Sequence, residues 1–266
     1  MVEITNKNSR PIDFIFNRFL RIFPIYFITT LLAALAHPDL RRIILSLLFI
    51  PHKNAEGVLM PILGVGWTLN YEMFFYILFS ASIFISAKYR SEITLAALFL
   101  IALTAVPFYG SAIIVQFALG IIIAKIKLKG TMNPWLLITT ITFSSLAMIL
   151  GDHLINREND WERVLAYGIP AGFILLAALS TEKRLPKLNL LHQIGDASYS
   201  IYLVHMFPMA AILSTISLIG LGNIISSLPL LAILALSFIG IIFGVLFSKF
   251  IELPIHRKIR SAIKFN

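Results

Sequence analysis

The clearest chemical signal is the segment Trp67–Tyr76, WTLNYEMFFY, which surrounds one acidic residue with hydroxyl-bearing side chains. Thr68, Glu72 and Tyr76 are spaced by four, so they share one face of a helix. A carboxylate among hydroxyls on such a face can accept a proton or bind a sugar hydroxyl. In the alternative interpretation, Trp67 marks the membrane interface and Glu72 forms a structural ion pair.

A second polar stripe lies in the segment GDASYSIYLVH, residues 195–205. Ser198, Tyr202 and His205 stand at i, i+4 and i+7, which again places them on one helix face. Histidine is the usual general base, and three aligned polar residues favour a polar cavity. The alternative is that His205 only forms a hydrogen bond between helices.

Two arginines, Arg18 and Arg21, are three positions apart and share a helix face, with Pro24 close behind them. Paired guanidinium groups suit a phosphate or pyrophosphate, because their planar donors match its oxygens. The alternative is that both arginines anchor a span at the membrane surface.

The block Glu252-Leu-Pro254-Ile-His256-Arg257 follows the last apolar run. A basic stop after a span, with a helix break, accounts for it without any chemical role. The histidines are too scattered for a metal site. The absence of cysteine excludes disulfides, thiolate metal sites and a cysteine nucleophile.

The elements that position these residues are set by composition. Hydrophobic residues make up 58% of the chain and charged residues 13%, whereas a soluble domain has about 25% charged residues. Such a chain presents apolar surface to lipid. The net charge of +9 does not indicate nucleic acid, because the basic residues lie between apolar runs, as in membrane loops.

The sequence therefore predicts an all-α, polytopic transmembrane bundle. A shorter run, Ile43–Ile50, is bounded by Arg42 and Pro51, and we interpret it as a re-entrant or interfacial segment. The eight expected spans are 19–36, 65–87, 92–109, 111–126, 134–151, 163–180, 197–218 and 228–250.

The distribution of basic residues predicts that both termini are cytoplasmic. With alternating sides, 17 of the 22 lysines and arginines fall inside and 5 fall outside. The outer group is Arg41, Arg42, Lys53, Arg157 and Arg163.

Taken together, these blocks resemble the acyltransferase-3 family of bacterial inner-membrane proteins. The family shows an R-x-x-R element, a W-T-L-x-x-E-x-x-F-Y block, an S-Y-S-x-Y-L-x-H block and a final E-x-P, in this order. They correspond here to Arg18–Arg21, Trp67–Tyr76, Ser198–His205 and Glu252–Pro254. The segment GVGWTLNYEMFFY is similar to the corresponding segment in the branch of the family that acetylates exopolysaccharides such as succinoglycan. The resemblance covers essentially the whole chain.

The resemblance implies transfer of an acyl group from cytoplasmic acyl-CoA to a hydroxyl of a cell-surface or exopolysaccharide sugar. Acetyl is the acyl group that we expect. It implies a multi-pass protein of the bacterial inner membrane whose partners are the bilayer, acyl-CoA and a carbohydrate acceptor. Acyl-CoA is expected as donor substrate, with no bound cofactor and no nucleic acid.

From the chemistry of the residues, we predict that Glu72 and His205 are catalytic and border one cavity. Arg18 and Arg21 are expected at its cytoplasmic mouth. The remaining residues expected to bind substrate are Trp67, Thr68, Tyr71, Tyr76, Ser198 and Tyr202.

The family typically has ten spans, with an R-x10-H pair in the first. The eight spans expected here equal ten without the first two, and no such pair stands in a leading span. We therefore expect residues 1–266 to form a single, N-terminally truncated acyltransferase-3 domain. Two other functions stay open: an inactive or partner-dependent remnant of such an enzyme, and a transporter or flippase, which also has polar residues at mid-membrane.

Overall fold

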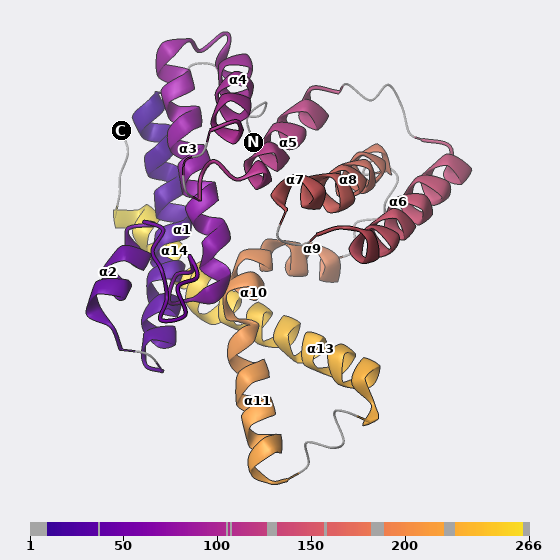
Figure 1. Ribbon diagram of the computed structural model, residues 1–266. Coiled ribbons are helices and arrows are strands. Elements are labelled where there is room, and N and C mark those ends of the chain that lie inside the picture. Colours follow the sequence, from indigo (N-terminus) through magenta and orange to yellow (C-terminus); the bar gives the residue numbers. More distant parts are fainter. Residues whose placement is uncertain are drawn as a thin grey trace. The chain divides into compact units, whose positions relative to one another are not determined.

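The computed structural model describes residues 10–36, 38–104, 106, 108–126, 132–156, 159–181, 189–220 and 227–262. Within these residues every regular element is a helix, and the only β pairing is an isolated bridge between Lys53 and Leu59 (Figure 1). The chain divides into two compact units, each described by itself below. The first unit comprises Met1–Phe16 and Tyr71–Pro186, and the second comprises Asn17–Asn70 and Lys187–Asn266.

The first unit is built mainly from the middle of the chain. Its helices are α3 (Trp67–Ile85), α4 (Arg90–Ala102), η2 (Ala112–Ile114), α5 (Val115–Lys125), α6 (Pro134–Leu154), α7 (Asp160–Arg163), the π-helical turn η3 (Val164–Gly168) and α8 (Ile169–Thr181). The helix α3 begins in the second unit, because its residues 67–70 are assigned there.

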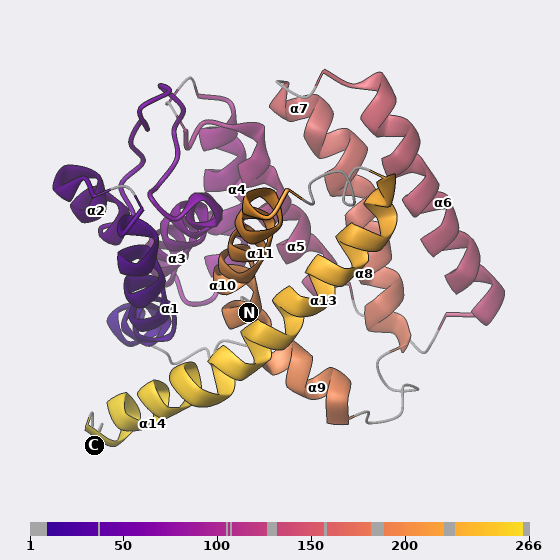
Figure 2. The ribbon, with the colours of Figure 1, turned by 90° about the horizontal axis from the view of Figure 1, so that it is seen from below.

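The second unit combines the N-terminal and C-terminal helices. They are α1 (Pro11–Ala34), α2 (Leu40–Leu47), η1 (Gly64–Gly66), α9 (Asn189–Asp196), α10 (Ser198–Val204), α11 (Met206–Leu218), α13 (Pro229–Phe247), the π-helical turn η4 (Ser248–Glu252) and α14 (Leu253–Ala262). Figure 2 shows α13 and α14 following one another as one continuous rod through η4.

Among the described residues, six helical segments are long and apolar enough to cross a membrane. They are Pro11–Ala34, Gly64–Ile85, Pro134–Leu154, Asp160–Thr181, Ser198–Leu218 and Pro229–Ala262. The prediction of an all-α polytopic bundle is thereby confirmed. The other two expected spans, 92–109 and 111–126, fall on α4 and on η2 with α5, which are shorter. The count of eight spans and the cytoplasmic termini stay predictions.

The predicted topology rests on the positions of the lysines and arginines. Those that lie outside the described residues are Lys7, Lys127, Lys129, Arg157, Lys183, Arg184, Lys187 and Lys264.

The first helix begins at Pro11, well before the expected start near residue 19. Proline is favoured in the first turn, where its missing N–H would be unpaired in any case, and Asp13 complements the helix dipole there. Arg18 and Arg21 therefore lie within α1 and not ahead of it. The distance between them along the helix is fixed by its geometry, which keeps both on one face.

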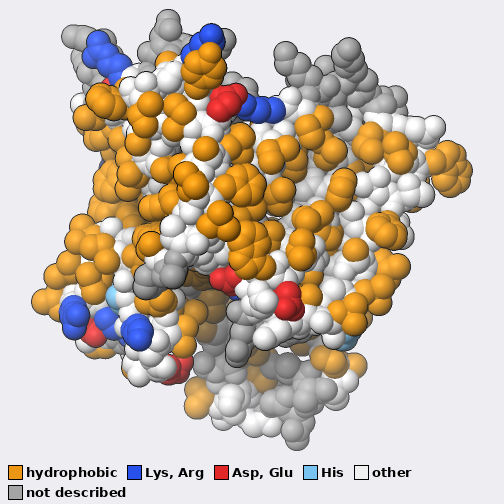
Figure 3. Space-filling model, turned by 45° about the horizontal axis from the view of Figure 1, so that its top comes forward, with side chains coloured by type: hydrophobic (Ala, Val, Ile, Leu, Met, Phe, Trp, Pro, Cys, Tyr) orange, Lys and Arg blue, Asp and Glu red, His pale blue; other side chains and the backbone are white. Residues whose placement is uncertain are grey.

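The surface matches a lipid environment. Hydrophobic side chains are spread over the whole of the face in Figure 3, whereas the charged side chains form small separate groups. Large apolar residues are strongly exposed, among them Leu218 at 87% and Phe84 at 83%. In water such exposure would favour aggregation, whereas in a bilayer the acyl chains cover it.

Two glycines set how closely α13 approaches α10 in the second unit. A Cβ atom built on Gly244 would lie 2.5 Å from the Cα atom of Ile201, and one built on Gly240 would lie 3.2 Å from the Cβ atom of His205. The glycines are four residues apart, so both lie on the face of α13 that meets α10. This close contact fixes the position of the helix segment that ends at His205.

Candidate active site

The start of α3 and the helix α10 meet through a pair of hydroxyls. The Tyr202 hydroxyl donates to the carbonyl oxygen of Val65 at 2.6 Å and lies 2.6 Å from the Oγ1 atom of Thr68. The Thr68 hydroxyl also lies 3.3 Å from the Val65 carbonyl oxygen, so both hydroxyls gather on this one acceptor. Two of the residues predicted to bind substrate are thus in direct contact, although 134 positions separate them.

The imidazole of His205 is held by the last turn of α10. Its Nδ1 atom lies 2.8 Å from the carbonyl oxygen of Tyr202 and 3.1 Å from that of Ile201. A carbonyl oxygen only accepts, so Nδ1 carries the proton. In the neutral ring the basic nitrogen is then Nε2, which is the atom that can take a proton from a hydroxyl.

A buried carboxylate on the next helix completes this region. Glu252 is 8% exposed, and its Oε2 atom accepts hydrogen bonds from Ser200 at 2.6 Å and from Ser248 at 2.8 Å. Its other oxygen lies 3.9 Å from the Nε2 atom of His256. Two donors and an imidazole compensate a buried charge that would otherwise be very costly.

Two arginines lie near the histidine beside this carboxylate. The guanidinium groups of Arg21 and Arg260 are close enough to act electrostatically on His256. The Tyr199 hydroxyl donates to the carbonyl oxygen of Ile22 at 2.8 Å, which joins α10 to the turn of α1 that follows Arg21. The sequence prediction placed Arg21 on the donor side, and the structure adds the histidine and carboxylate of the C-terminal block to its surroundings.

Sequence reasoning assigned no chemistry to Glu252 and did not single out Ser200 or Ser248. Two signals could have found them: Ser248 and Glu252 are spaced by four, and Ser200 is in the S-Y-S block. The close seam of α10 and α13 was also missed. Its signal is the pattern Gly240-x-x-x-Gly244, which is typical of helix pairs in membranes.

The other predicted residues of the second unit differ in burial. Arg18, Trp67 and Tyr202 are half-buried, whereas Arg21 and Ser198 are exposed. The stripe predicted along α10 is therefore uneven: Tyr202 and His205 are partly covered, while Ser198, in the first turn, is open.

In the first unit, α3 carries the predicted carboxylate. The Tyr76 hydroxyl donates to the Oε1 atom of Glu72, one turn away, and the Tyr76 ring packs edge-on against Phe14 with centroids 6.0 Å apart. Glu72 itself is half-buried. The predicted alignment of a carboxylate with a hydroxyl on one helix face is thus present as a hydrogen bond.

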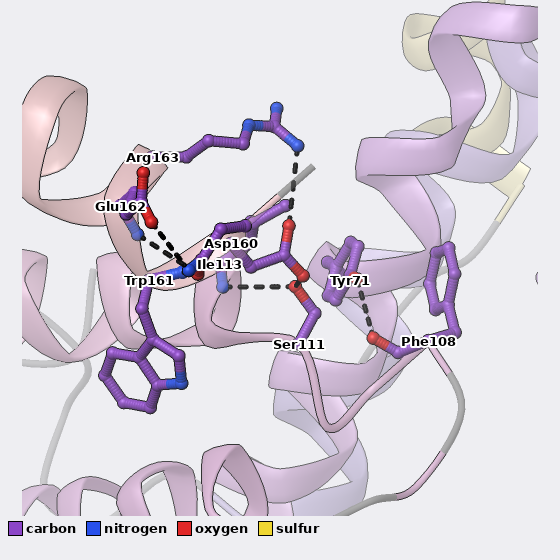
Figure 4. Close-up of polar contacts among 9 residues, drawn as sticks. Tyr71, Phe108, Ser111, Ile113, Asp160, Trp161, Glu162 and Arg163 are labelled. Atoms are coloured by element: carbon purple, nitrogen blue, oxygen red, sulfur yellow. Dashed lines mark hydrogen bonds and ion pairs between the residues drawn. The ribbon is translucent and has the colours of Figure 1, made fainter. Parts of the chain in front are cut away.

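Tyr71 belongs to a neighbouring polar cluster of the same unit (Figure 4). Its hydroxyl donates to the carbonyl oxygen of Phe108 at 2.7 Å, and its ring stacks on that of Phe108. Nearby, Ser111 donates to Asp160, which lies 3.5 Å from Arg163 in an ion pair (Figure 4). These contacts tie the loop after α4 to α3 and to α7.

The predicted residues thus fall into two groups. Tyr71, Glu72 and Tyr76 belong to the first unit, and the remaining ones belong to the second. Thr68 contacts Tyr202 in the second unit, and Glu72 contacts Tyr76 in the first. The expected common cavity of Glu72 and His205 would join the two units, and it stays a prediction.

Comparison with known proteins identifies the family of the chain. Residues 5–249 match the family model of the acyltransferase-3 family, described as an acyltransferase domain. The chain is also 33% identical over 245 residues to "Exopolysaccharide production protein ExoZ" of Rhizobium meliloti (strain 1021), covering 84% of this chain and 76% of that protein. No solved structure matches the chain.

Proposed function

Because this chain belongs to the acyltransferase-3 family and is a multi-pass membrane acyltransferase, we propose that it transfers an acetyl group from cytoplasmic acyl-CoA to a hydroxyl of an exopolysaccharide sugar. The name of the relative, a protein of exopolysaccharide production, supports the acceptor class. The bacterial inner membrane, where acyl-CoA and a growing surface saccharide come within reach of one protein, is the proposed location.

The observation that carries the proposal is the pair of backbone carbonyls facing the Nδ1 atom of His205, which favours one tautomer of the neutral ring. With Nδ1–H held by two backbone carbonyls, Nε2 is free of the proton in the neutral ring. We assign Nε2 as the base that takes the proton of the acceptor hydroxyl. The hydroxyl oxygen then bonds to the thioester carbonyl carbon, the carbon–sulfur bond breaks, and the CoA thiolate leaves and is protonated.

The acceptor sugar is assigned to the polar groups around this base. Thr68 and Tyr202, held together at 2.6 Å, present a hydroxyl pair one turn from His205. Ser198 and the indole of Trp67 offer a further hydrogen-bonding group and an apolar ring surface. Sugar recognition uses this mixture, because each ring has one apolar face and a rim of hydroxyls.

The residues of α3 in the first unit are proposed to work on the same substrates. Glu72, with Tyr76 donating to it, is assigned as a second proton acceptor or as a clamp for a sugar hydroxyl. Tyr71 is assigned to substrate binding beside it.

The donor is assigned to the basic side of α1. Arg18 and Arg21 share a helix face, and their guanidinium groups suit the pyrophosphate of CoA. The positive charge around His256 extends this basic region along the second unit. Charge of one sign attracts the anionic donor to the site.

The test uses the purified chain in detergent with acetyl-CoA and an exopolysaccharide-derived oligosaccharide. Because the protein contains no cysteine, a thiol reagent detects only the CoA that is released. Acetylated oligosaccharide is identified by mass spectrometry. We expect His205→Ala to lower the turnover number about 100-fold or more, the usual contribution of a general base.

His192→Ala is the matched control, since His192 is an exposed histidine of α9 in the same unit. It should retain the wild-type rate. Full activity of His205→Ala would remove the assignment of the base. Absence of any acetylated oligosaccharide with the wild-type chain, across neutral and acidic acceptors, would contradict the proposed function.

A further inference from the structure

A cavity of about 670 Å³ lies in the second unit, away from α10 and α13. It is formed by the helix α2 and the loop that follows it. Its lining is unusual for this apolar chain, because six of its eleven lining residues are charged or polar. The charged and polar residues that line it are Asp39, Arg41, Arg42, His52, Lys53 and Asn54.

The walls of this cavity are held by buried hydrogen bonds. The Ser46 hydroxyl oxygen, fully buried, accepts from the backbone N–H of Ile62 at 3.0 Å and lies 3.5 Å from the Nε2 atom of His52. The Nδ1 atom of His52 donates to the carbonyl oxygen of Ile50 at 2.9 Å. These bonds attach the loop to the helix, so the cavity is part of the fold.

The turn at the far end of the loop is equally defined. The side chain of Asn54 accepts from the N–H groups of Glu56 and Val58 at 3.0 and 2.9 Å, and Gly57 takes the left-handed conformation with φ 81°. Lys53 is thereby kept next to the cavity by a closed loop.

The cavity has a net positive charge. Arg41, Arg42 and Lys53 contribute three cations, and Asp39 is the one carboxylate among the lining residues described. That carboxylate is already engaged, since it caps α2 by accepting from the backbone N–H of Arg42 at 3.1 Å. Within the described part of the chain, the buried Nε atom of Arg42 has no hydrogen-bond partner. A ligand with an anionic group would satisfy it.

The exposed apolar residues of α2 and its C-cap indicate where the cavity lies with respect to the membrane. Leu40, Ile44 and Leu48 are spaced by four and exposed at 72%, 49% and 61%. Such a short helix with one apolar and one cationic side lies in the membrane interface, with its apolar side in lipid. The predicted topology places this interface on the outer side, away from the acyl-CoA pool.

We propose that this cavity binds an anionic saccharide, with Arg41, Arg42 and Lys53 holding a carboxylate or phosphate group of the sugar acceptor. The inference deepens the proposed function, because it names the class of acceptor. A volume of about 670 Å³ is within the range of small-ligand sites and accommodates one or two sugar units. Arginine is the side chain best suited to either anion, since its donors bind two oxygens at once.

The experiment measures binding separately from acetyl transfer. The purified chain in detergent is titrated calorimetrically with three probes: a glucuronic-acid-containing tetrasaccharide, the same tetrasaccharide with its carboxylate reduced to a hydroxyl, and a 1-phosphate of the reduced form. We expect the neutral probe to bind at least tenfold more weakly than one of the two anionic probes. Whichever anionic probe binds more tightly identifies the source of the charge.

Three variants link this preference to the cavity. Arg41→Gln combined with Lys53→Gln, and Arg42→Gln alone, should each reduce the preference for the anionic probe to less than threefold. Arg41→Lys combined with Arg42→Lys keeps the charge and should retain most of the preference. The matched control is Arg257→Gln combined with Lys258→Gln on α14, two exposed cations that do not line the cavity.

Equal binding of the neutral and anionic probes would overturn the inference, as would an unchanged preference in the glutamine variants. Displacement of the tetrasaccharides by phosphatidylglycerol in nanodiscs would assign the cavity to a lipid headgroup and would also overturn it. None of these results depends on CoA release. A chain that acetylates a neutral oligosaccharide and shows no anionic preference would retain the proposed function and lose this inference alone.

Discussion

The hydroxyl of Tyr202 on α10 lies 2.6 Å from the Oγ1 atom of Thr68 at the start of α3. The tyrosine donates in turn to the carbonyl oxygen of Val65 at 2.6 Å. This chain of two hydrogen bonds joins the two sequence blocks that carry most of the family's polar residues. It also gives a site whose parts can be tested singly and in pairs.

Removal of the tyrosine hydroxyl should destabilise the protein. Tyr202→Phe removes the hydrogen bonds of Tyr202 to the Val65 carbonyl and to the Thr68 hydroxyl, and we expect a loss of about 1–3 kcal/mol in the free energy of unfolding. Thr68→Val should cost less after Tyr202→Phe than it does alone, because the two residues are coupled. Denaturant unfolding followed by tryptophan fluorescence measures both effects. Tyr89→Phe, at an exposed tyrosine, is the control, and equal losses at the two tyrosines would contradict the expectation.

The seam of α10 and α13 should tolerate no side chain at Gly244. A Cβ atom there would lie 2.5 Å from the backbone of Ile201, so Gly244→Ala has to separate the helices. We expect a loss of about 1–3 kcal/mol in stability, together with a lower turnover number because His205 moves with α10.

Gly240→Ala should be milder, since its nearest atom is at 3.2 Å. Gly120→Ala is the control: this helical glycine on α5 has nothing within 4 Å of an added Cβ, and alanine favours a helix by about 0.5–1 kcal/mol. The melting temperature should be lowest for Gly244→Ala, higher for Gly240→Ala and highest for Gly120→Ala. A stabilised Gly244→Ala protein would show that the helices can repack.

The stability of the protein should fall more when the side chain of Glu252 is truncated than when its charge alone is removed. Glu252→Ala leaves the hydroxyls of Ser200 and Ser248 without an acceptor, and breaking a buried charged site in this way costs about 3–5 kcal/mol. Glu252→Gln keeps an oxygen acceptor at the same reach and should cost less. The free energy of unfolding in denaturant distinguishes them. If both variants match the wild type, the carboxylate contributes nothing to stability.

Use of acetyl-CoA should depend on the shape of the Arg18 and Arg21 guanidinium groups as well as on their charge. Arg18→Ala or Arg21→Ala is expected to raise the KM for acetyl-CoA about tenfold or more, because each removes charged hydrogen bonds to phosphate. Lysine at either position should recover little, since a point charge does not reproduce the guanidinium fork. Steady-state kinetics with varied acetyl-CoA measures this. Full recovery by lysine at both positions would favour the anchoring role.

The predicted topology can be checked with reporter fusions. Fusions after Lys129 and after Lys187 should report the cytoplasm, and fusions near Asn156 and Asn223 should report the periplasm, because 17 of the 22 basic residues then lie inside. A periplasmic signal at Lys187 would overturn the count of eight spans.

Much of the architecture follows from composition and period. Apolar runs of bilayer length predicted where most of the long helices are, because the hydrophobic pattern fixes a span before any tertiary contact forms. The four-residue spacing of Glu72 and Tyr76 predicted a shared face, and the structure shows the hydrogen bond. Local spacing of this kind needs only the geometry of one helix.

Contacts between distant segments were harder to predict. The spacing of Ser248 and Glu252 is local, but nothing in the sequence shows that Ser200 donates to the same glutamate, since that contact depends on how α10 and α13 pack. The start of α1 at Pro11 was also missed, because the residues before Arg18 are mostly polar and the apolar run that predicted the span begins only near residue 19. The cavity beside α2 arises from a folded loop, for which the apolar pattern carries no information.

The π-helical turn Ser248–Glu252 has a consequence for the register of the C-terminal rod. A π turn accommodates one residue more than an α turn, and one residue corresponds to about 100° of rotation. The face of α14 that meets the bilayer therefore does not continue the lipid-facing line of α13. Deleting a single residue within the turn would restore an ordinary helix and rotate every side chain after it by about 100°. In this chain, the rotational register of α14 depends on the π turn that precedes it.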